Sequence, residues 1–344
     1  MRTPRAWIAA AAAVATVTLS GIGVTNAATL EDVRAAGTLK CGINTGLPGF
    51  AYTDDRGTWT GFDVAYCQAL AAAVLGDPTK VRYVNVSAAN RFTALASGEI
   101  DVLSRNTTWT FQRDNELGFT FAGVSYYDGQ GFLIRRSLRV ASAKELNGAS
   151  VCIQRGTTTE LNLADYFRAN NLRYEPVPIA DNEEARVAYV AGRCDVYTAD
   201  ASALAATKSA LQNPNDHMIL PEVISKEPLG PLVRQGDERW SDIARWTLNV
   251  LLAAEEYGVT QANVRDMARA ATPNPEVNRM LGSEGSLGAM LGLAPNWAVN
   301  VIAAVGNYGE MFERYLGART PLGLPRGLNA LYKNGGVLYP LPMR

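Results

Sequence analysis

Short apolar runs and amphipathic stretches alternate along the chain from residue 39 onward. A short apolar run bounded by turn residues is typical of a strand buried in a sheet, whereas a 3.6-residue periodicity that follows a capping residue is typical of a helix. Asp63 is well placed to cap one such helix. The pattern predicts strands at 39–43, 81–86 and 100–103, and helices at 63–75 and 90–97.

A second series of the same kind begins at residue 149. Two extended segments, 126–135 and 229–234, precede and follow it. Alternation of strands and helices favours an α/β fold with mainly parallel sheets. The second series predicts strands at 149–153, 174–179 and 194–198, and helices at 160–169, 183–191 and 200–211.

Two α/β units joined by two extended crossings predict two lobes with a cleft between them. The alternative is two sequential, independent domains. The second crossing and a strong amphipathic helix at 241–257 favour the interwoven arrangement, in which the chain returns to the first lobe. The predicted organisation is lobe 1 at 28–125 plus 233–260, lobe 2 at 126–232 with hinge strands at its ends, and a C-terminal extension at 261–344 that is helical at 264–271, 276–281 and 298–314 and then irregular.

The N-terminus has the pattern of an export signal. Arg2 and Arg5 precede an alanine-rich apolar run at 7–24, and small residues follow it up to Ala27. A transmembrane anchor would need about 20 strongly apolar residues, and this run is diluted by threonine, serine and glycine. We predict a signal peptide at 1–27 and a soluble mature protein exported to the periplasm.

Four cysteines in an exported chain favour two disulfides, for which three pairings are possible. Because a bridge between the lobes would block movement at the hinge, we favour the pairs within each lobe, Cys41 with Cys67 and Cys152 with Cys194. The single histidine, His217, has no metal-binding residues at suitable spacing nearby. The sequence therefore predicts neither a metal site nor a cofactor.

The charge of the chain does not favour nucleic acid as a partner. The formal net charge is −1, and loss of Arg2 and Arg5 with the leader makes it −3. Neither a basic stripe nor a run of lysines is present.

Polar residues follow the predicted strand at 100–103. Arg105, Asn106 and Thr108 lie in the turn, and Arg113 follows one or two helical turns later. Ligands of open α/β sheets bind outside the carboxyl ends of strands, where such a turn lies. The amide, the hydroxyl and the guanidinium fork of Asn106, Thr108 and Arg113 form a donor set suited to a carboxylate.

The second series offers the complementary groups. Thr158 opens a predicted helix whose N–H groups can receive an anion, and Asp200 follows a strand, where it could hold an ammonium group. Together these residues are complementary to a zwitterion such as an α-amino acid. Other interpretations remain open, namely Thr157 or Thr158 as a simple helix cap with Glu160, Asp200 as a helix cap, Arg105 in a structural ion pair, and Leu47 and Phe50 in the core.

Several motifs resemble those of periplasmic solute-binding proteins of family 3, the receptors of ABC uptake systems for polar amino acids. The chain is most similar to the general L-amino-acid-binding subgroup. The resemblance covers the mature chain to about residue 257, and Val305–Glu310 of the extension is also similar. It rests on Gly37-Thr38-Leu39-Lys40-Cys41-Gly42, Thr60-Gly61-Phe62-Asp63, and residues 96–114, 126–132, 154–163, 192–200 and 225–235.

The resemblance implies a two-lobed type II periplasmic-binding-protein fold and a role for each predicted residue. Arg113 would clamp the α-carboxylate of the ligand, assisted by Thr108 and by Thr158. Asp200 would take the α-ammonium group together with a main-chain oxygen near Asn106.

Two further positions concern the ligand side chain. Leu47 stands where relatives often have an aromatic residue that covers the ligand. Arg105 stands where many relatives have a small polar residue, so it could meet the ligand side chain.

The leading functional hypothesis is a monomeric, non-enzymatic transport receptor. Its lobes would close on an L-amino acid, and the closed form would dock on a membrane permease of an ABC transporter. An alternative is a dehydratase of the prephenate or arogenate type on the same scaffold. A third hypothesis, a sensory ligand-binding domain, would normally require a membrane tether.

Overall fold

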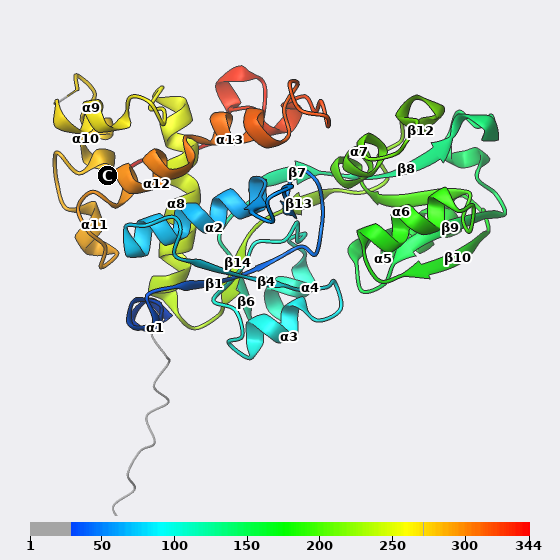
Figure 1. Cartoon of the computed structure of the whole chain (residues 1–344), viewed down its shortest axis with the longest axis horizontal. Helices are drawn as coiled ribbons and strands as arrows, with labels where there is room; N and C mark the ends of the chain where they lie inside the picture. Colours follow the sequence, from blue (N-terminus) through cyan, green and yellow to red (C-terminus); the bar gives the residue numbers. More distant parts are fainter. Residues whose placement is uncertain (1–28, 271) are drawn as a thin grey trace, which may run out of the picture.

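Two lobes joined by a short pair of strands make up the structure (Figure 1). The computed structural model describes residues 29–270 and 272–344. The predicted signal peptide at 1–27 lies outside the described residues. Each lobe contains a five-stranded sheet with helices packed on it, which confirms the predicted α/β fold class. Within the described part of the chain, no helix is both long and apolar enough to cross a membrane.

Lobe 1 is built on strands whose apolar residues are buried. β1 (Leu39–Ile43) runs parallel to both of its neighbours, β4 (Val81–Asn85) and β5 (Val102–Leu103). The apolar residues of β1 are fully buried, because helices such as α2 (Phe62–Leu75) cover the sheet. The other elements of lobe 1 are α1 (Thr29–Ala36), β2 (Tyr52–Thr53), β3 (Trp59–Thr60), α3 (Arg91–Ala96), α4 (Phe111–Asn115), β6 (Phe119–Phe121), β14 (Leu232–Arg234) and α8 (Glu238–Glu256).

Lobe 2 repeats this arrangement. β9 (Ala149–Gln154) runs parallel to β10 (Tyr174–Ile179) and to β11 (Val196–Asp200). β8 (Gln130–Arg135) pairs antiparallel with β11 on its other side. The remaining elements of lobe 2 are α5 (Thr158–Ala169), α6 (Asn182–Val190), α7 (Ala201–Ser209) and β12 (His217–Ile219).

Each lobe carries one disulfide. Cys41 in β1 is bonded to Cys67 in α2, and Cys152 in β9 is bonded to Cys194 just before β11. The predicted pairing is confirmed. Neither bridge joins one lobe to the other, so both leave the connection between the lobes free to bend.

The chain crosses between the lobes twice. β7 (Tyr126–Asp128) and β13 (Glu227–Leu229) pair antiparallel in this connection. The first crossing leads into β8 of the lobe 2 sheet, and the second leads into β14 of the lobe 1 sheet. Each sheet thus contains a strand that enters directly from the hinge. As a result, the polar turn after β5 and the start of α5 line the same cavity.

The C-terminal extension packs on lobe 1, with α9 to α11 at the end away from lobe 2 (Figure 1). The single helix predicted at 298–314 is wrong, because Gly306 leaves the helical conformation with φ of 83°. Asn307 and Glu310 then form a capping box that starts a new helix. The helices of the extension are α9 (Val264–Arg269), α10 (Pro275–Leu281), α11 (Leu287–Met290), α12 (Trp297–Val305) and α13 (Tyr308–Tyr315).

The irregular end of the chain docks on the hinge. Asn329 is buried, and its side-chain oxygen accepts a hydrogen bond from the Tyr127 N–H at 2.6 Å. Its Nδ2 donates to the Tyr127 carbonyl at 3.0 Å. Arg326 contacts both carboxylate oxygens of Glu255 at 2.9 and 3.0 Å. The tail therefore holds one hinge strand against α8, with Asn329 at the end of a short 3-10 helix, Gly327–Asn329.

Replacing Asn329 by alanine is expected to lower the free energy of unfolding by about 2 kcal/mol, because two main-chain groups of Tyr127 lose their partner. Chemical denaturation followed by circular dichroism measures the change. Asn334→Ala is the matched control, since Asn334 is exposed in the same tail. Equal unfolding free energies for the two variants would contradict the role given to Asn329.

Candidate functional site

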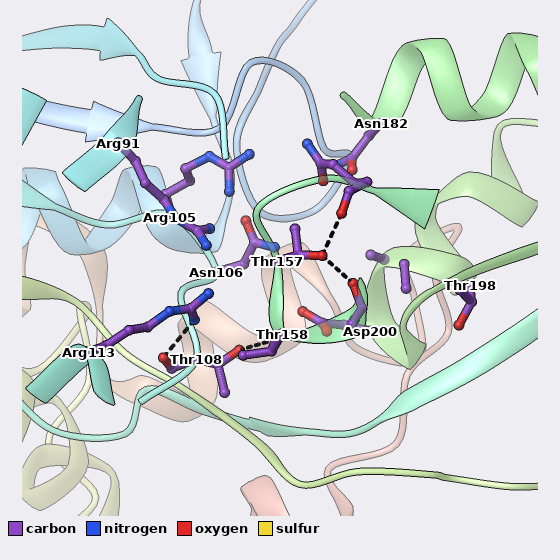
Figure 2. Close-up of a pocket in the computed structure, with 14 residues that line it drawn as sticks. Arg91, Arg105, Asn106, Thr108, Arg113, Thr157, Thr158, Asn182, Thr198 and Asp200 are labelled. Atoms are coloured by element: carbon purple, nitrogen blue, oxygen red, sulfur yellow. Dashed lines mark hydrogen bonds between the residues drawn. The ribbon is translucent and has the colours of Figure 1, made fainter. Parts of the chain in front are cut away.

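A charged cavity lies between the lobes (Figure 2). The guanidinium groups of Arg91, Arg105 and Arg113 point into it from lobe 1, and Asp200 lies across from them in lobe 2. The predicted ligand-binding residues other than Leu47 all line this cavity. The lining residues are Arg91, Arg105, Asn106, Thr108, Arg113, Gln154, Thr157, Thr158, Thr159, Asn182, Thr198, Ala199, Asp200 and Ala203.

Arg113 is held by the turn that precedes its helix. The Thr110 side chain caps α4 by accepting a hydrogen bond from the Arg113 N–H at 3.2 Å. The Arg113 guanidinium donates through Nη1 to the Thr108 carbonyl at 2.9 Å. Burial lowers the pKa of Arg113, while Glu227 and then Asp200 raise it. The remaining N–H groups of this nearly buried fork face the cavity and can bind an anion.

Asn106 adopts an unusual backbone conformation that two side chains hold in place. Its φ is 26°, a region that residues other than glycine rarely visit. Asp63 accepts a hydrogen bond from the Asn106 N–H at 3.0 Å, and Asn44 donates to the Asn106 side-chain oxygen at 2.9 Å. The position of Asp63 in the sequence predicted that it caps α2, but it does not. Gly61 occupies that place, and Asp63 is buried beneath the turn.

Thr157 and Thr158, the two candidate threonines at the start of α5, have different roles. Thr157 is the helix cap, and its hydroxyl accepts a hydrogen bond from the Glu160 N–H at 3.3 Å. Glu160 accepts in turn from the Gly156 N–H at 3.0 Å. Since Thr157 and Glu160 satisfy the helix start, Thr158 at the first helical position is free to turn its hydroxyl toward the hinge.

Glu227, which was not among the predicted residues, binds both predicted threonine hydroxyls. This carboxylate lies on β13 and is 1 % exposed. Its Oε2 accepts from Thr108 at 2.5 Å and from Thr158 at 2.9 Å, and its Oε1 accepts from Asn162 and Ser225 at 2.7 Å each. A hydroxyl has one hydrogen, so Thr108 and Thr158 present oxygen lone pairs rather than hydrogens to the cavity. The available signal was an acidic residue two positions before the predicted extended segment at 229–234.

Asp200 is a buried carboxylate without a hydrogen-bond partner among the described residues. It precedes α7, yet its side chain does not cap that helix. Burial raises the pKa of Asp200 well above its ordinary value, Asp128 and Glu227 raise it further, and Arg113 and Arg91 lower it. A cation bound against Asp200 would offset the cost of burying its charge.

Arg105 and Arg91 complete the positive side of the cavity. Arg105 donates through Nε to the Val86 carbonyl at 2.8 Å, and burial lowers its pKa to about 10 despite the nearby charge of Asp63. Arg91 was not among the predicted residues. The signal for it was a basic residue at the first position of a helix, where the helix dipole disfavours positive charge.

The structure places Leu47 outside the cavity lining. Its side chain is 1 % exposed and packs in the main apolar core of lobe 1. Its backbone forms an isolated bridge with Ala51, which turns the loop inward. The interpretation of Leu47 as core is therefore correct, and its inclusion among the ligand-binding residues is not supported.

This fold and this cavity define a two-lobed binding protein whose ligand site lies between hinged lobes. Residues 39–263 match the family described as "Bacterial extracellular solute-binding proteins, family 3". The chain belongs to this family, as the sequence motifs predicted.

Three known proteins illustrate the similarity. The general L-amino acid-binding periplasmic protein AapJ of Rhizobium johnstonii is 58% identical over 97% of this chain and 98% of its own length. The glutamate/glutamine/aspartate/asparagine-binding protein BztA of Rhodobacter capsulatus is also 58% identical, over 94% of this chain and 95% of its own. A solved periplasmic binding protein from Brucella ovis with glutathione bound is 57% identical over 92% of this chain and all of its own, with a TM-score of 0.90.

Proposed function

We propose that this protein is the periplasmic amino-acid receptor of an ABC uptake transporter. Arg113 would bind the α-carboxylate of an L-amino acid, and Asp200 would bind its α-ammonium group. The observation that carries the proposal is the position of Arg113 and Asp200, which belong to different lobes and line one cavity. A zwitterion bound there contacts both lobes, so binding favours the closed arrangement.

The surrounding groups have roles that follow from their hydrogen bonds. The first N–H groups of α5, including that of Thr158, favour the carboxylate because of the helix dipole. The Thr108 hydroxyl oxygen, whose hydrogen is donated to Glu227, would accept from the ammonium group. A main-chain oxygen near Asn106 would share that group.

The relatives support this assignment. AapJ and BztA are both named as amino-acid-binding proteins, and glutathione, which the Brucella ovis protein holds, carries the same α-amino and α-carboxylate groups. We extend these ligand classes to this chain, together with export by the predicted signal peptide, action as a monomer and a permease partner. The dehydratase hypothesis receives less support, because these relatives are binding proteins.

Calorimetric titration of the mature protein with a panel of L-amino acids and glutathione tests the proposal. We expect saturable binding of one ligand per chain for at least some L-amino acids, with the ligand recovered unmodified. Absence of binding across the panel would refute the receptor, and conversion of prephenate or arogenate would favour the enzyme.

A further inference from the structure

We propose that the C-terminal extension clamps the hinge and thereby fixes the position at which the hinge bends. The matched family covers residues 39–263 of this chain, and the extension follows that part and packs on lobe 1 (Figure 1). Two of its side chains bind the first crossing between the lobes. The clamp would act on the movement of the lobes in the unliganded protein, so it goes beyond the choice of ligand.

The clamp consists of Tyr308 and Asn329, which both bind the main chain of the first crossing. The Tyr308 hydroxyl donates to the Ser125 carbonyl at 2.8 Å. Asn329 accepts from the Tyr127 N–H at 2.6 Å and donates to the Tyr127 carbonyl at 3.0 Å. Both clamp side chains are buried, which strengthens these hydrogen bonds because the surroundings are less polar than water. The start of β7 is therefore fixed to the body of lobe 1.

Asn329 takes the place of a third strand beside the two strands of the hinge. Tyr127 lies opposite Pro228 in the hinge sheet, and proline has no N–H to offer to the Tyr127 carbonyl. Both main-chain groups of Tyr127 bind Asn329 instead. On the outer side of β13, the Pro228 carbonyl accepts a hydrogen bond from the Trp109 N–H at 2.8 Å. The Tyr127–Pro228 pair is thus held from both sides by lobe 1 and its extension.

The neighbouring pair of the hinge sheet is held by lobe 2. Asp128 lies opposite Glu227, and its carboxylate accepts hydrogen bonds from the N–H and the hydroxyl of Ser202 in α7. Glu227 accepts from Thr158 of α5, and it also accepts from Thr108 of lobe 1. Hydrogen bonds to lobe 2 therefore replace those to the extension within one step along each strand. We place the bend of the hinge between these two pairs.

The clamp limits the backbone dihedrals that can change as the lobes open. On the second crossing, Pro228 fixes its own φ at about −65° and restricts the residue before it. The first crossing at 125–129 contains no proline, and there the bonds from Asn329 restrain the backbone of Tyr127. Loss of these bonds would let the bend spread along β7, and the open protein would gain orientations of its lobes. Greater conformational entropy of the open state opposes closure.

Another role for the same contacts makes a different prediction. Tyr308 and Asn329 could serve only to stabilise the fold of lobe 1. In that case their loss would lower the free energy of unfolding and leave the relative orientation of the lobes as it is. The distance between the lobes in the unliganded protein separates the two roles.

The test measures this distance by pulsed electron paramagnetic resonance on the full mature chain, at a temperature at which every variant is folded. Thr93→Cys in α3 and Ala169→Cys in α5 provide exposed positions for spin labels in lobe 1 and lobe 2. The four native cysteines do not react, because they form two disulfides. We expect Asn329→Ala to broaden the distance distribution of the unliganded protein. Saturating L-glutamate should restore a narrow distribution, because the ligand ties the two lobes together.

Calorimetric titration of the unlabelled variants measures the consequence for binding. Asn329→Ala should lower the affinities for L-glutamate and L-glutamine by the same factor of about 3 to 10, the effect of freeing the backbone of about one residue. Tyr308→Phe removes the other clamp bond and should broaden the distribution in the same way. Asn334→Ala and Tyr339→Phe alter exposed side chains of the same tail, and both should leave distances and affinities unchanged.

Two results would overturn the clamp. One is an unchanged distance distribution in both Asn329→Ala and Tyr308→Phe, even if these variants unfold more easily. The other is an equal broadening in the control Asn334→Ala, which would show that any change in the tail has this effect. Absence of amino-acid binding by the wild type would instead refute the proposed function, while the distances in the unliganded protein would still test the clamp.

Discussion

Arg113→Met is expected to weaken the binding of every L-amino acid by about 30- to 4,000-fold, because the ligand carboxylate loses its buried, charge-assisted partner. Methionine keeps the apolar body of the side chain and removes the fork. The effect should be the same for ligands with neutral and acidic side chains, since Arg113 is assigned to the group that all of them share. Isothermal titration calorimetry measures it.

The control for this substitution is Arg155→Met, which removes an exposed positive charge of the same kind. Thermal unfolding of both variants verifies that the fold persists. Affinities for Arg113→Met within about threefold of the wild type would show that the α-carboxylate binds elsewhere. A loss confined to acidic amino acids would place the side chain, rather than the head group, at Arg113.

Asp200→Asn is expected to have a similar effect, about 30-fold or more, and to change how binding depends on pH. Burial and neighbouring carboxylates raise the pKa of Asp200 in the unliganded protein, whereas a bound ammonium group lowers it. Below the raised pKa, Asp200 must release a proton before it can pair with the ammonium group. Affinity in the wild type should therefore be highest above that pKa and fall by up to about tenfold per pH unit below it.

Other buried carboxylates also have raised pKa values, so the pH profiles of the wild type and the variant must be compared. Burial raises the pKa of Asp63 to about 7 and that of Asp128 to about 6. Both groups are present in Asp200→Asn, so the difference between the two pH profiles reports Asp200 together with its charge interaction with Asp128. Parallel profiles for wild type and variant would contradict the assignment of the ammonium group to Asp200.

Much of the fold could be read from local patterns. The strand β1 and the helix α5 were predicted, because burial of apolar runs and the spacing of caps are properties of short segments. The cysteine pairs within each lobe were predicted instead from the need to leave the hinge free, and the structure confirms them. The break between α12 and α13 was missed, although Gly306 and Asn307 are a strong stop and start signal. The continuous apolar pattern on both sides concealed it.

Cavity-lining residues could be predicted where the chemistry of a side chain and its place near the end of a strand indicated the same role. Arg113 lies in the helix that follows β5, Asp200 is the last residue of β11, and both line the cavity. Their ligand contacts stay a prediction that the two variants test. Arg91 was missed because its basic side chain at the start of α3 is only a weak signal, and because the unsatisfied Nε becomes evident only once the side chain is buried. Leu47 was misassigned because its loop turns inward through a backbone bridge to Ala51.

The sequence by itself determined the order of strands and helices and the choice of polar residues at the strand ends, since these depend on neighbours along the chain, whereas it left three cysteine pairings open. Only the tertiary structure decided which of those polar groups remain available to a ligand. Glu227 takes the hydroxyl hydrogens of Thr108 and Thr158 across separations of 119 and 69 residues. Burial leaves the Nε of Arg91 and the carboxyl group of Asp200, which lie on opposite lobes, without hydrogen-bond partners among the described residues. Availability is a property of what surrounds a group in space, and contacts between distant segments of the chain set it.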